Sequence, residues 1–271
     1  MNIDWAEEWR KRRENSSWAR QLQKKGLTSA EFYDQFKLAD RHEEYEKWTG
    51  YPGPILERMK DFVTPDSAVL DIGAGAGAYT IPFAKMAREV TVVEPSQGQV
   101  SRLLKRASRE GLKNIKIINK TWEDVSEEEL GKYDLVNAAY CFAMPDMRAA
   151  LLKMWKVTKG VLFLVAFVEH DFRDVFEIIS EDYDPGPDYI YLYNILYQLG
   201  IKANVEIITR KYLLPLDFNM EILRSSWDLS PEMEQKIIEH LSNTGRIVEQ
   251  GSDRLVKHTY RDAIIWCKKE S

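Results

Sequence analysis

The stretch from Val69 to Ala78 constrains the fold of this chain more than any other. It reads Val-Leu-Asp-Ile-Gly-Ala-Gly-Ala-Gly-Ala, so an apolar strand passes through a carboxylate into three glycines at alternate positions. Glycine has no Cβ and adopts positive φ freely, and such a loop before a helix brings backbone N–H groups against a ligand. The stretch therefore predicts a strand, a ligand-binding turn and a helix, in that order.

Strand and helix patterns alternate through the middle of the chain. Apolar runs at 90–93, 115–118, 133–136 and 161–168 predict strands, and the apolar spacing between 147 and 157 predicts a helix after Pro145 and Asp146. This alternation is typical of a parallel, doubly wound sheet, which binds ligands beyond the carboxyl ends of its strands. Residues 205–210 and 254–268 predict two further strands, the last of them antiparallel.

Two acidic residues accompany the glycine loop. Asp71 lies two residues before the first glycine, and Glu94 closes the next apolar strand. The loose dinucleotide pattern of Gly73, Gly75 and Ala78 also fits a nicotinamide-dependent oxidoreductase, and Glu94 suits either kind of cofactor. Asp71 and the long segment before the first strand favour a different family. Over about residues 65 to 168, the chain resembles the class I, Rossmann-like S-adenosylmethionine-dependent methyltransferases.

The resemblance implies a fold, a cofactor and a set of binding residues. The implied fold is an α/β, doubly wound, seven-stranded and mostly parallel sheet with an antiparallel last strand, and the cofactor is S-adenosylmethionine. Tyr45 and Tyr51, which lie before the first core helix, are candidates to reach the methionine carboxylate. The expected cofactor-binding residues are Asp71, Gly73, Gly75, Gly77, Glu94, Trp122, Glu123, Ala139 and Tyr45.

The two ends of the chain predict additions to this core. Trp5 and Trp9 lie one helical turn apart, and Thr28 with Glu31 forms a capping-box signature, so residues 1–64 predict an N-terminal helical cap. Residues 65–271 form the expected cofactor-binding core. Aromatic and turn-rich segments near 170–200 and 213–253 predict lid-like helical insertions in it.

Composition bears on the partners and on the compartment. A net charge of −5 and a pI near 5.6 disfavour nucleic acid as a partner, and the basic runs at 10–13 and 102–109 are interpreted as solvated helix faces. No apolar run is long enough for a membrane span and no signal peptide is evident, so we expect a cytoplasmic protein. Two cysteines and scattered histidines predict neither a disulfide framework nor a metal site. The oligomeric state stays open, with a homodimer as one alternative.

The candidate catalytic residues are His170 and Tyr140. His170, between Glu169 and Asp171, follows the fifth strand and could accept a proton from the methyl acceptor, and Tyr140 follows the fourth strand, where the family transfers the methyl group. The sequence Asn137-Ala138-Ala139-Tyr140 lacks the prolines of the nucleic-acid amino methyltransferases. We therefore expect a methyltransferase for a small molecule or metabolite. The alternatives are an NAD(P)-dependent oxidoreductase and a noncatalytic S-adenosylmethionine-binding protein.

Overall fold

The computed structural model describes residues 3–35, 40–169 and 171–269. Its centre is one mixed sheet with strands in the order β3-β2-β1-β4-β5-β8-β6, and a short β7 pairs with β8. The five strands from β1 to β5 run parallel, whereas β8 runs antiparallel to β5, β6 and β7. The strands are β1 Ala68–Ile72, β2 Glu89–Val93, β3 Ile115–Ile118, β4 Tyr133–Ala139, β5 Thr158–Glu169, β6 Asn204–Pro215, β7 Ile247–Gln250 and β8 Asp253–Lys268.

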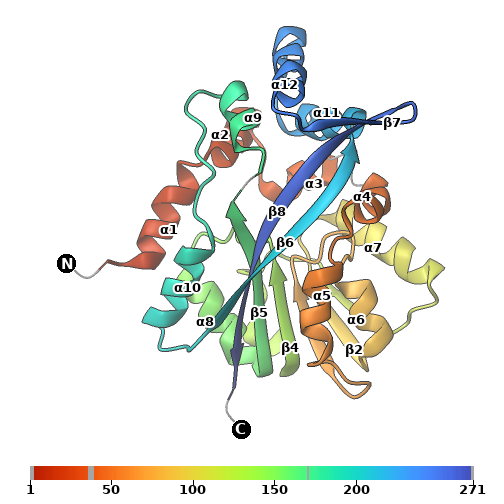
Figure 1. The fold of residues 1–271 in the computed structure, drawn as a ribbon. Coiled ribbons are helices and arrows are strands. Elements are labelled where there is room, and N and C mark those ends of the chain that lie inside the picture. The colour runs from red at the N-terminus through yellow and green to blue at the C-terminus, as the bar shows by residue number, and fades with distance from the viewer. Residues whose placement is uncertain (1–2, 36–39, 170, 270–271) are drawn as a thin grey trace.

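Helices cover both faces of the sheet (Figure 1). One face packs against α1 (Trp5–Glu14), α8 (Met147–Val157) and α10 (Tyr189–Gln198), and the other against α5 (Gly53–Lys60), α6 (Thr80–Met86) and α7 (Gln97–Arg109). Because successive strand residues point to opposite faces, Val69 enters the second of these cores and Leu70 the first. Both faces are apolar, which explains the unbroken hydrophobic runs of the parallel strands.

The predicted fold class is confirmed, with an eighth, short strand added. The third strand has the predicted bounds, and the fifth extends beyond the predicted run at both ends. The helix of residues 189–198 was expected within a lid-like insertion. Its Leu192, Ile195 and Leu196 are instead fully buried in the core beside the sheet, so this helix is part of a covering layer.

The C-terminal additions form a small core of their own. The long antiparallel strands β6 and β8 extend past the parallel ones, towards α9 (Arg173–Ile179), α11 (Leu216–Ser226) and α12 (Pro231–Asn243) (Figure 1). Phe172, Leu216, Trp227, Ile237 and Val256 belong to one buried cluster among these elements. The segment at 213–253 therefore stands at one end of the sheet as a packed unit.

Between α1 and α5, which pack on opposite faces of the sheet, the N-terminal segment passes the carboxyl ends of the parallel strands (Figure 1). The helices of this part are α2 (Ser17–Lys25), α3 (Ser29–Gln35) and α4 (His42–Thr49). The predicted capping box is present, because the Thr28 N–H donates to Glu31 and the Glu31 N–H donates to Thr28 Oγ1. Helix α3 contacts α7, and α4 contacts β6, so the cap lies on both halves of the sheet.

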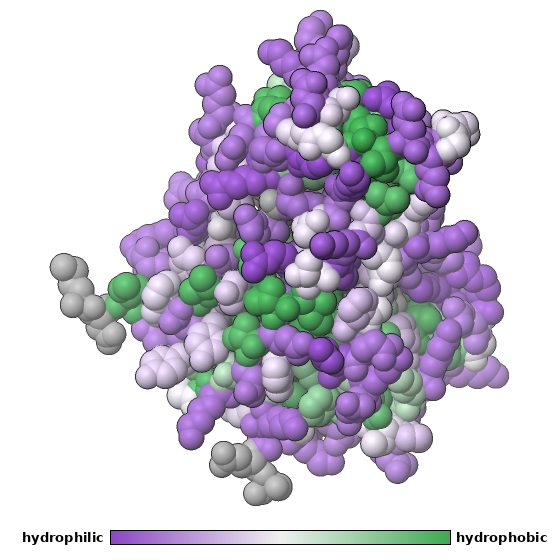
Figure 2. Space-filling model, viewed as in Figure 1, coloured by the Kyte–Doolittle hydropathy of each residue, from purple (hydrophilic) through white to green (hydrophobic). Residues whose placement is uncertain are grey.

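The surface in the same view is mostly hydrophilic (Figure 2). Hydrophobic side chains gather near its middle, over the region where β6 and β8 cross the view. Among the described residues, no helix has the length and apolar character needed to cross a membrane.

Candidate active site

The glycine loop follows β1 and faces the end of β4. Gly73, Gly75 and Gly77 all have positive φ, at 66°, 56° and 92°. A Cβ on Gly73 would lie 2.2 Å from Cys141 Cβ, so only glycine lets the two strand ends approach this closely. A Cβ on Gly75, by contrast, would meet no atom within 4 Å. The middle of the loop therefore offers open space at its backbone, as the predicted cofactor requires.

Asp71 holds the two strand ends and the next helix together. Its carboxylate accepts hydrogen bonds from Thr80 Oγ1 at 2.5 Å and Asn137 Nδ2 at 2.8 Å, and it is 1% exposed. Burial raises the pKa of Asp71 to about 6, although both hydrogen bonds oppose that rise. In this structure the Asp71 carboxylate ties the start of α6 and the end of β4 to β1, beside the glycine loop. Direct contact of Asp71 with the cofactor stays a prediction.

Glu94, at the end of β2, touches the loop itself. Its carboxylate accepts from the Gly75 N–H at 2.8 Å and from the Ser96 N–H at 2.9 Å. Ser96 Oγ in turn donates to Asp34 of α3 at 2.7 Å. Burial raises the pKa of Glu94, and the two N–H groups counter part of that effect. One hydrogen-bonded path thus joins the cap, the start of α7, the second strand and the glycine loop.

These residues fit S-adenosylmethionine. The open backbone at Gly75 gives a place for close contact, and the neighbouring carboxylate of Glu94 accepts hydroxyl hydrogen bonds of the kind that a ribose offers. In the predicted adenine turn, Trp122 is buried and its neighbours are exposed. The Trp122 ring is 3% exposed, its Nε1 donates to Ala150 O at 3.2 Å, and Lys153 Nζ lies 4.4 Å above it. Glu123 is exposed.

Tyr140 follows Ala139, the last residue of β4, in a left-handed backbone conformation with φ of 54°. Non-glycine residues adopt this conformation at a cost of about 1 to 2 kcal/mol, and such strain concentrates at functional sites. The Tyr140 hydroxyl donates to buried Asp262 of β8. Burial is the main cause that raises the pKa of Tyr140 well above its usual value, so the phenol stays neutral and is not a base.

Cys141 is no nucleophile here. Its Sγ donates to Ile72 O at 3.2 Å, and burial raises the pKa of the thiol.

The two tyrosines from the cap occupy different positions. Tyr45 packs against Leu214 and Phe218, near Tyr212 of β6. Tyr51 contacts Tyr79, just after the glycine loop, with ring centroids 5.7 Å apart. Tyr51 therefore lies closer to the glycine loop than Tyr45, which lies towards β6, and contact of either tyrosine with the cofactor stays a prediction.

His170 lies outside the described residues, so its catalytic role stays a prediction. Its neighbours are engaged: Glu169 pairs with Arg261, and Asp171 accepts from the Thr259 N–H at 2.8 Å. His258 is bonded at both ring nitrogens, to Asp171 and Asn219, and has no free nitrogen for proton transfer. No group of three metal-ligating side chains occurs among the described residues.

Sequence reasoning passed over the ion pair of Arg210 and Asp262. Arg210 Nε donates to Asp262 Oδ2 at 2.6 Å, and the two side chains are 5% and 0% exposed. The register of β6 and β8 brings Arg210 opposite Tyr260 and Tyr212 opposite His258. Alternate residues of a strand share one face, so these side chains form one polar and aromatic stripe. The detectable signal was a charged residue two positions from a tyrosine in each segment: Arg210 before Tyr212, and Asp262 after Tyr260.

Comparisons with known proteins agree with this geometry. A family model described as a methyltransferase domain matches residues 69–160. An uncharacterised protein of Haemophilus influenzae is 30% identical over 201 residues, which cover 67% of this chain and 74% of that protein. The ribosomal RNA small subunit methyltransferase A of Desulforapulum autotrophicum is 35% identical over 80 residues, 28% of this chain and 27% of that enzyme.

A solved structure of similar fold is a putative methyltransferase of Bacillus halodurans. It has a TM-score of 0.59 and 14% identity, and the match covers 81% of this chain and all of that one. The glycine loop and its acids fit a methyl donor, and the methyltransferase-domain model covers all of them. The chain belongs to the class I S-adenosylmethionine-dependent methyltransferases and is an enzyme of that kind.

Proposed function

We propose that this methyltransferase acts on a small molecule or metabolite, bound beside Tyr140 at the end of β4. The observation that carries the proposal is the enclosure of Tyr140. Its ring centroid lies 4.6 Å from that of Phe167 on β5 and 6.0 Å from that of Tyr51 in the cap, and its hydroxyl bonds to Asp262. Side chains from the cap, β5 and β8 surround the position where the family transfers the methyl group, and such walls suit a small acceptor.

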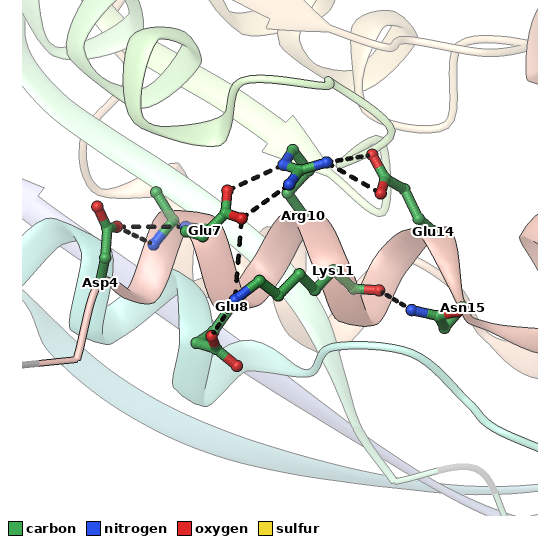
Figure 3. Close-up of polar contacts among 8 residues, drawn as sticks. Asp4, Glu7, Glu8, Arg10, Lys11, Glu14 and Asn15 are labelled. Carbon is green, nitrogen blue, oxygen red and sulfur yellow. Dashed lines mark hydrogen bonds and ion pairs between the residues drawn. The ribbon is translucent and has the colours of Figure 1, made fainter.

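The basic runs support the same acceptor class, because acidic partners occupy them. In α1, Arg10 bonds to Glu7 and Glu14, and Lys11 bonds to Glu8 (Figure 3). In α7, three arginines pair with acids in α4 or just before it. Arg102 pairs with Asp40, Arg106 with Glu46 and Arg109 with Glu43. A surface that binds RNA needs cationic side chains that are available to neutralise phosphates. The paired arginines and lysine of these runs are already neutralised by acids of the same chain.

The relatives that act on ribosomal RNA share only a short part of this chain. The Desulforapulum enzyme matches over 28% of it. Asn137, the first residue of the segment that partly resembles the nucleic-acid amino methyltransferase motif, is fully buried and bonds to Asp71. We therefore infer that this chain shares the cofactor of those relatives, and we do not infer that its methyl acceptor is RNA.

The residues of the chain contribute binding, orientation and exclusion of water. S-Adenosylmethionine supplies an activated methyl group: the acceptor's lone pair forms the new bond to carbon while the carbon–sulfur bond breaks and sulfur keeps its electron pair. The glycine loop and Glu94 would hold the donor, and Tyr140 with Tyr51 would orient the acceptor in line and exclude water, which are the main demands of this displacement. His170 is the candidate to take any proton that the acceptor releases.

The test begins with binding. Calorimetry of the purified protein should detect S-adenosylmethionine and S-adenosylhomocysteine but not NADH. The protein is then incubated with methyl-labelled donor and a cell extract split by ultrafiltration into small molecules and macromolecules. Label in the small-molecule fraction supports the proposal. Label confined to RNA or protein, with none in small molecules, would show that the acceptor class is wrong.

A further inference from the structure

Among the described residues, one of the buried polar atoms without a hydrogen-bond partner is a nitrogen of Arg210. Arg210 is 6% exposed, and its Nε and Nη2 bond to Asp262, but its buried Nη1 has no hydrogen-bond partner. Buried donors of folded proteins are nearly always paired, so an unpaired one calls for an explanation. A ligand that accepts a hydrogen bond at this place would provide it.

The surroundings of the guanidinium define that ligand. Its carbon lies 5.3 Å from the ring centroids of Tyr51 and Tyr260 and 5.9 Å from that of Tyr212. Burial is the main reason that the tyrosines at 51 and 260 have pKa values raised well above the usual one, so both are neutral. Neutral aromatic rings give contact area to an apolar body and add no negative charge.

The charges of Arg210 and Asp262 bear on how much negative charge the ligand can carry. Asp262 already provides one negative charge against Arg210, and a single guanidinium nitrogen remains unpaired. Because this pair is already neutral, a phosphate dianion would add two negative charges to the buried site, whereas a carboxylate adds one and gives Nη1 an anionic acceptor.

The site adjoins the place of methyl transfer. Asp262 accepts hydrogen bonds from both Arg210 and Tyr140, and Tyr51 lies near both. A molecule whose anionic group meets Arg210 Nη1 therefore has its remaining atoms beside the end of β4.

We propose that the methyl acceptor is a small carboxylic acid whose carboxylate is bound by Arg210 Nη1 among the tyrosines of the cap and of β6 and β8. This inference rests on the proposed function and narrows it to one substrate class. Arg210 holds the acceptor at a group that does not react, and the methyl group goes to a nucleophilic atom elsewhere in the same molecule.

The acceptor found by labelled transfer is identified by mass spectrometry and then assayed together with its carboxamide. We expect a carboxylic acid. Arg210→Gln should raise its KM by about 10- to 100-fold, as for the loss of a charge-assisted hydrogen bond, and leave the affinity for S-adenosylhomocysteine unchanged. The wild type should prefer the acid to the amide, and the variant should lose that preference, so the two changes are not additive.

Arg58→Gln is the matched control. It removes an exposed arginine of α5 that bonds to Glu206 of β6, the strand that also carries Arg210. If Arg210→Gln does not fold, Arg210→Lys keeps the charge beside Asp262 but lacks the planar fork, and it should show the same loss of acid preference. An acceptor without a carboxylate, or a preference for acid that survives in the Arg210 variant, would overturn this inference while the proposed function stands. Label in no small molecule at all would overturn both.

Discussion

At the scale of single residues, the loop glycine Gly75 gives the sharpest test of cofactor binding. Gly75→Val should abolish binding of S-adenosylmethionine in calorimetry, because the new side chain enters the open space at the loop. The left-handed backbone should cost about 1 to 2 kcal/mol of stability in addition. Gly111→Val is the control, since Gly111 has φ of 69° and equally open surroundings but lies in the turn after α7. Equal cofactor affinity in the two variants would exclude Gly75 from the site.

Glu94 links the loop to the donor's predicted ribose position. Glu94→Gln should weaken S-adenosylhomocysteine binding by about 1 to 3 kcal/mol, because it removes a charged acceptor from the Gly75 N–H. Glu89→Gln, at the exposed start of the same strand, provides the comparison. A dissociation constant that is the same for both variants would contradict the assignment of Glu94.

The buried carboxyl of Asp71 predicts a pH dependence of stability. The pKa of Asp71 is raised from 3.8 to about 6 on folding, so the folded state binds the proton more tightly between these values. Its contribution therefore favours folding at low pH and is lost as the pH rises through 6. Compared with Asp71→Asn, the wild type should gain about 1.4 kcal/mol of stability when the pH falls from 7.5 to 5.

Urea unfolding at the two pH values measures this gain. Asp66→Asn, which removes an exposed carboxylate just before β1, is the matched control. A difference between the wild type and Asp71→Asn that does not change with pH would refute the raised pKa.

The residue scale also shows where prediction from sequence ended. The glycine loop, Asp71 and Glu94 could be proposed from the sequence because each has a local signature: a strand end, an acid and a loop within a few positions. Trp122 is predicted at the adenine turn, and that role stays a prediction; its hydrogen bond to Ala150 of α8, 28 residues away along the chain, could not be predicted from the sequence. Arg210 and Asp262 were overlooked because only the pairing of β6 with β8 brings them together.

At the scale of elements, local pattern predicted the parallel strands well and the C-terminal additions less well. Strand β6 was expected over 205–210, but it continues to Pro215 because its second half pairs with Leu255–Thr259 of β8. Helix α9 and strand β7 were not predicted. Both are short, and they are stabilised by contacts with α12 and β8 instead of by a strong pattern of their own.

Helix α3 gives the prediction that belongs to this scale. Asp34 joins it to α7, because Oδ1 accepts from Ser96 Oγ and from the Gly98 N–H. Asp34→Ala should lower the local opening free energy of α3 by about 1 to 2 kcal/mol, which hydrogen exchange of residues 29–35 measures. Asp40→Ala breaks a more exposed pair with Arg102 and should have a smaller effect. Unchanged exchange in Asp34→Ala would show that α3 is held by apolar contacts alone.

At the scale of the whole molecule, charge governs the expected partners. The net charge is −5, and most of the arginines in the basic runs pair with acids of the same chain. A labelled RNA hairpin should therefore show no binding in anisotropy measurements at physiological salt, and lowering the salt should produce only weak association. Micromolar binding with a steep salt dependence would contradict this expectation and bring an RNA acceptor back into question.

Asp262, whose carboxylate bonds to both Arg210 and Tyr140, lies near the C-terminal end of the chain and is therefore synthesised after both of them. The glycine loop, Glu94 and Tyr140 are all translated before β8, and the hydrogen bonds of Gly75 to Glu94, of Thr80 to Asp71 and of Cys141 to Ile72 involve no later residue. Arg210 and Tyr140 acquire their partner only when Asp262 has emerged from the ribosome. Because the chain is made from the N-terminus, every residue proposed to hold the donor is synthesised before β8, whereas the proposed acceptor site is complete only once β8 has been made.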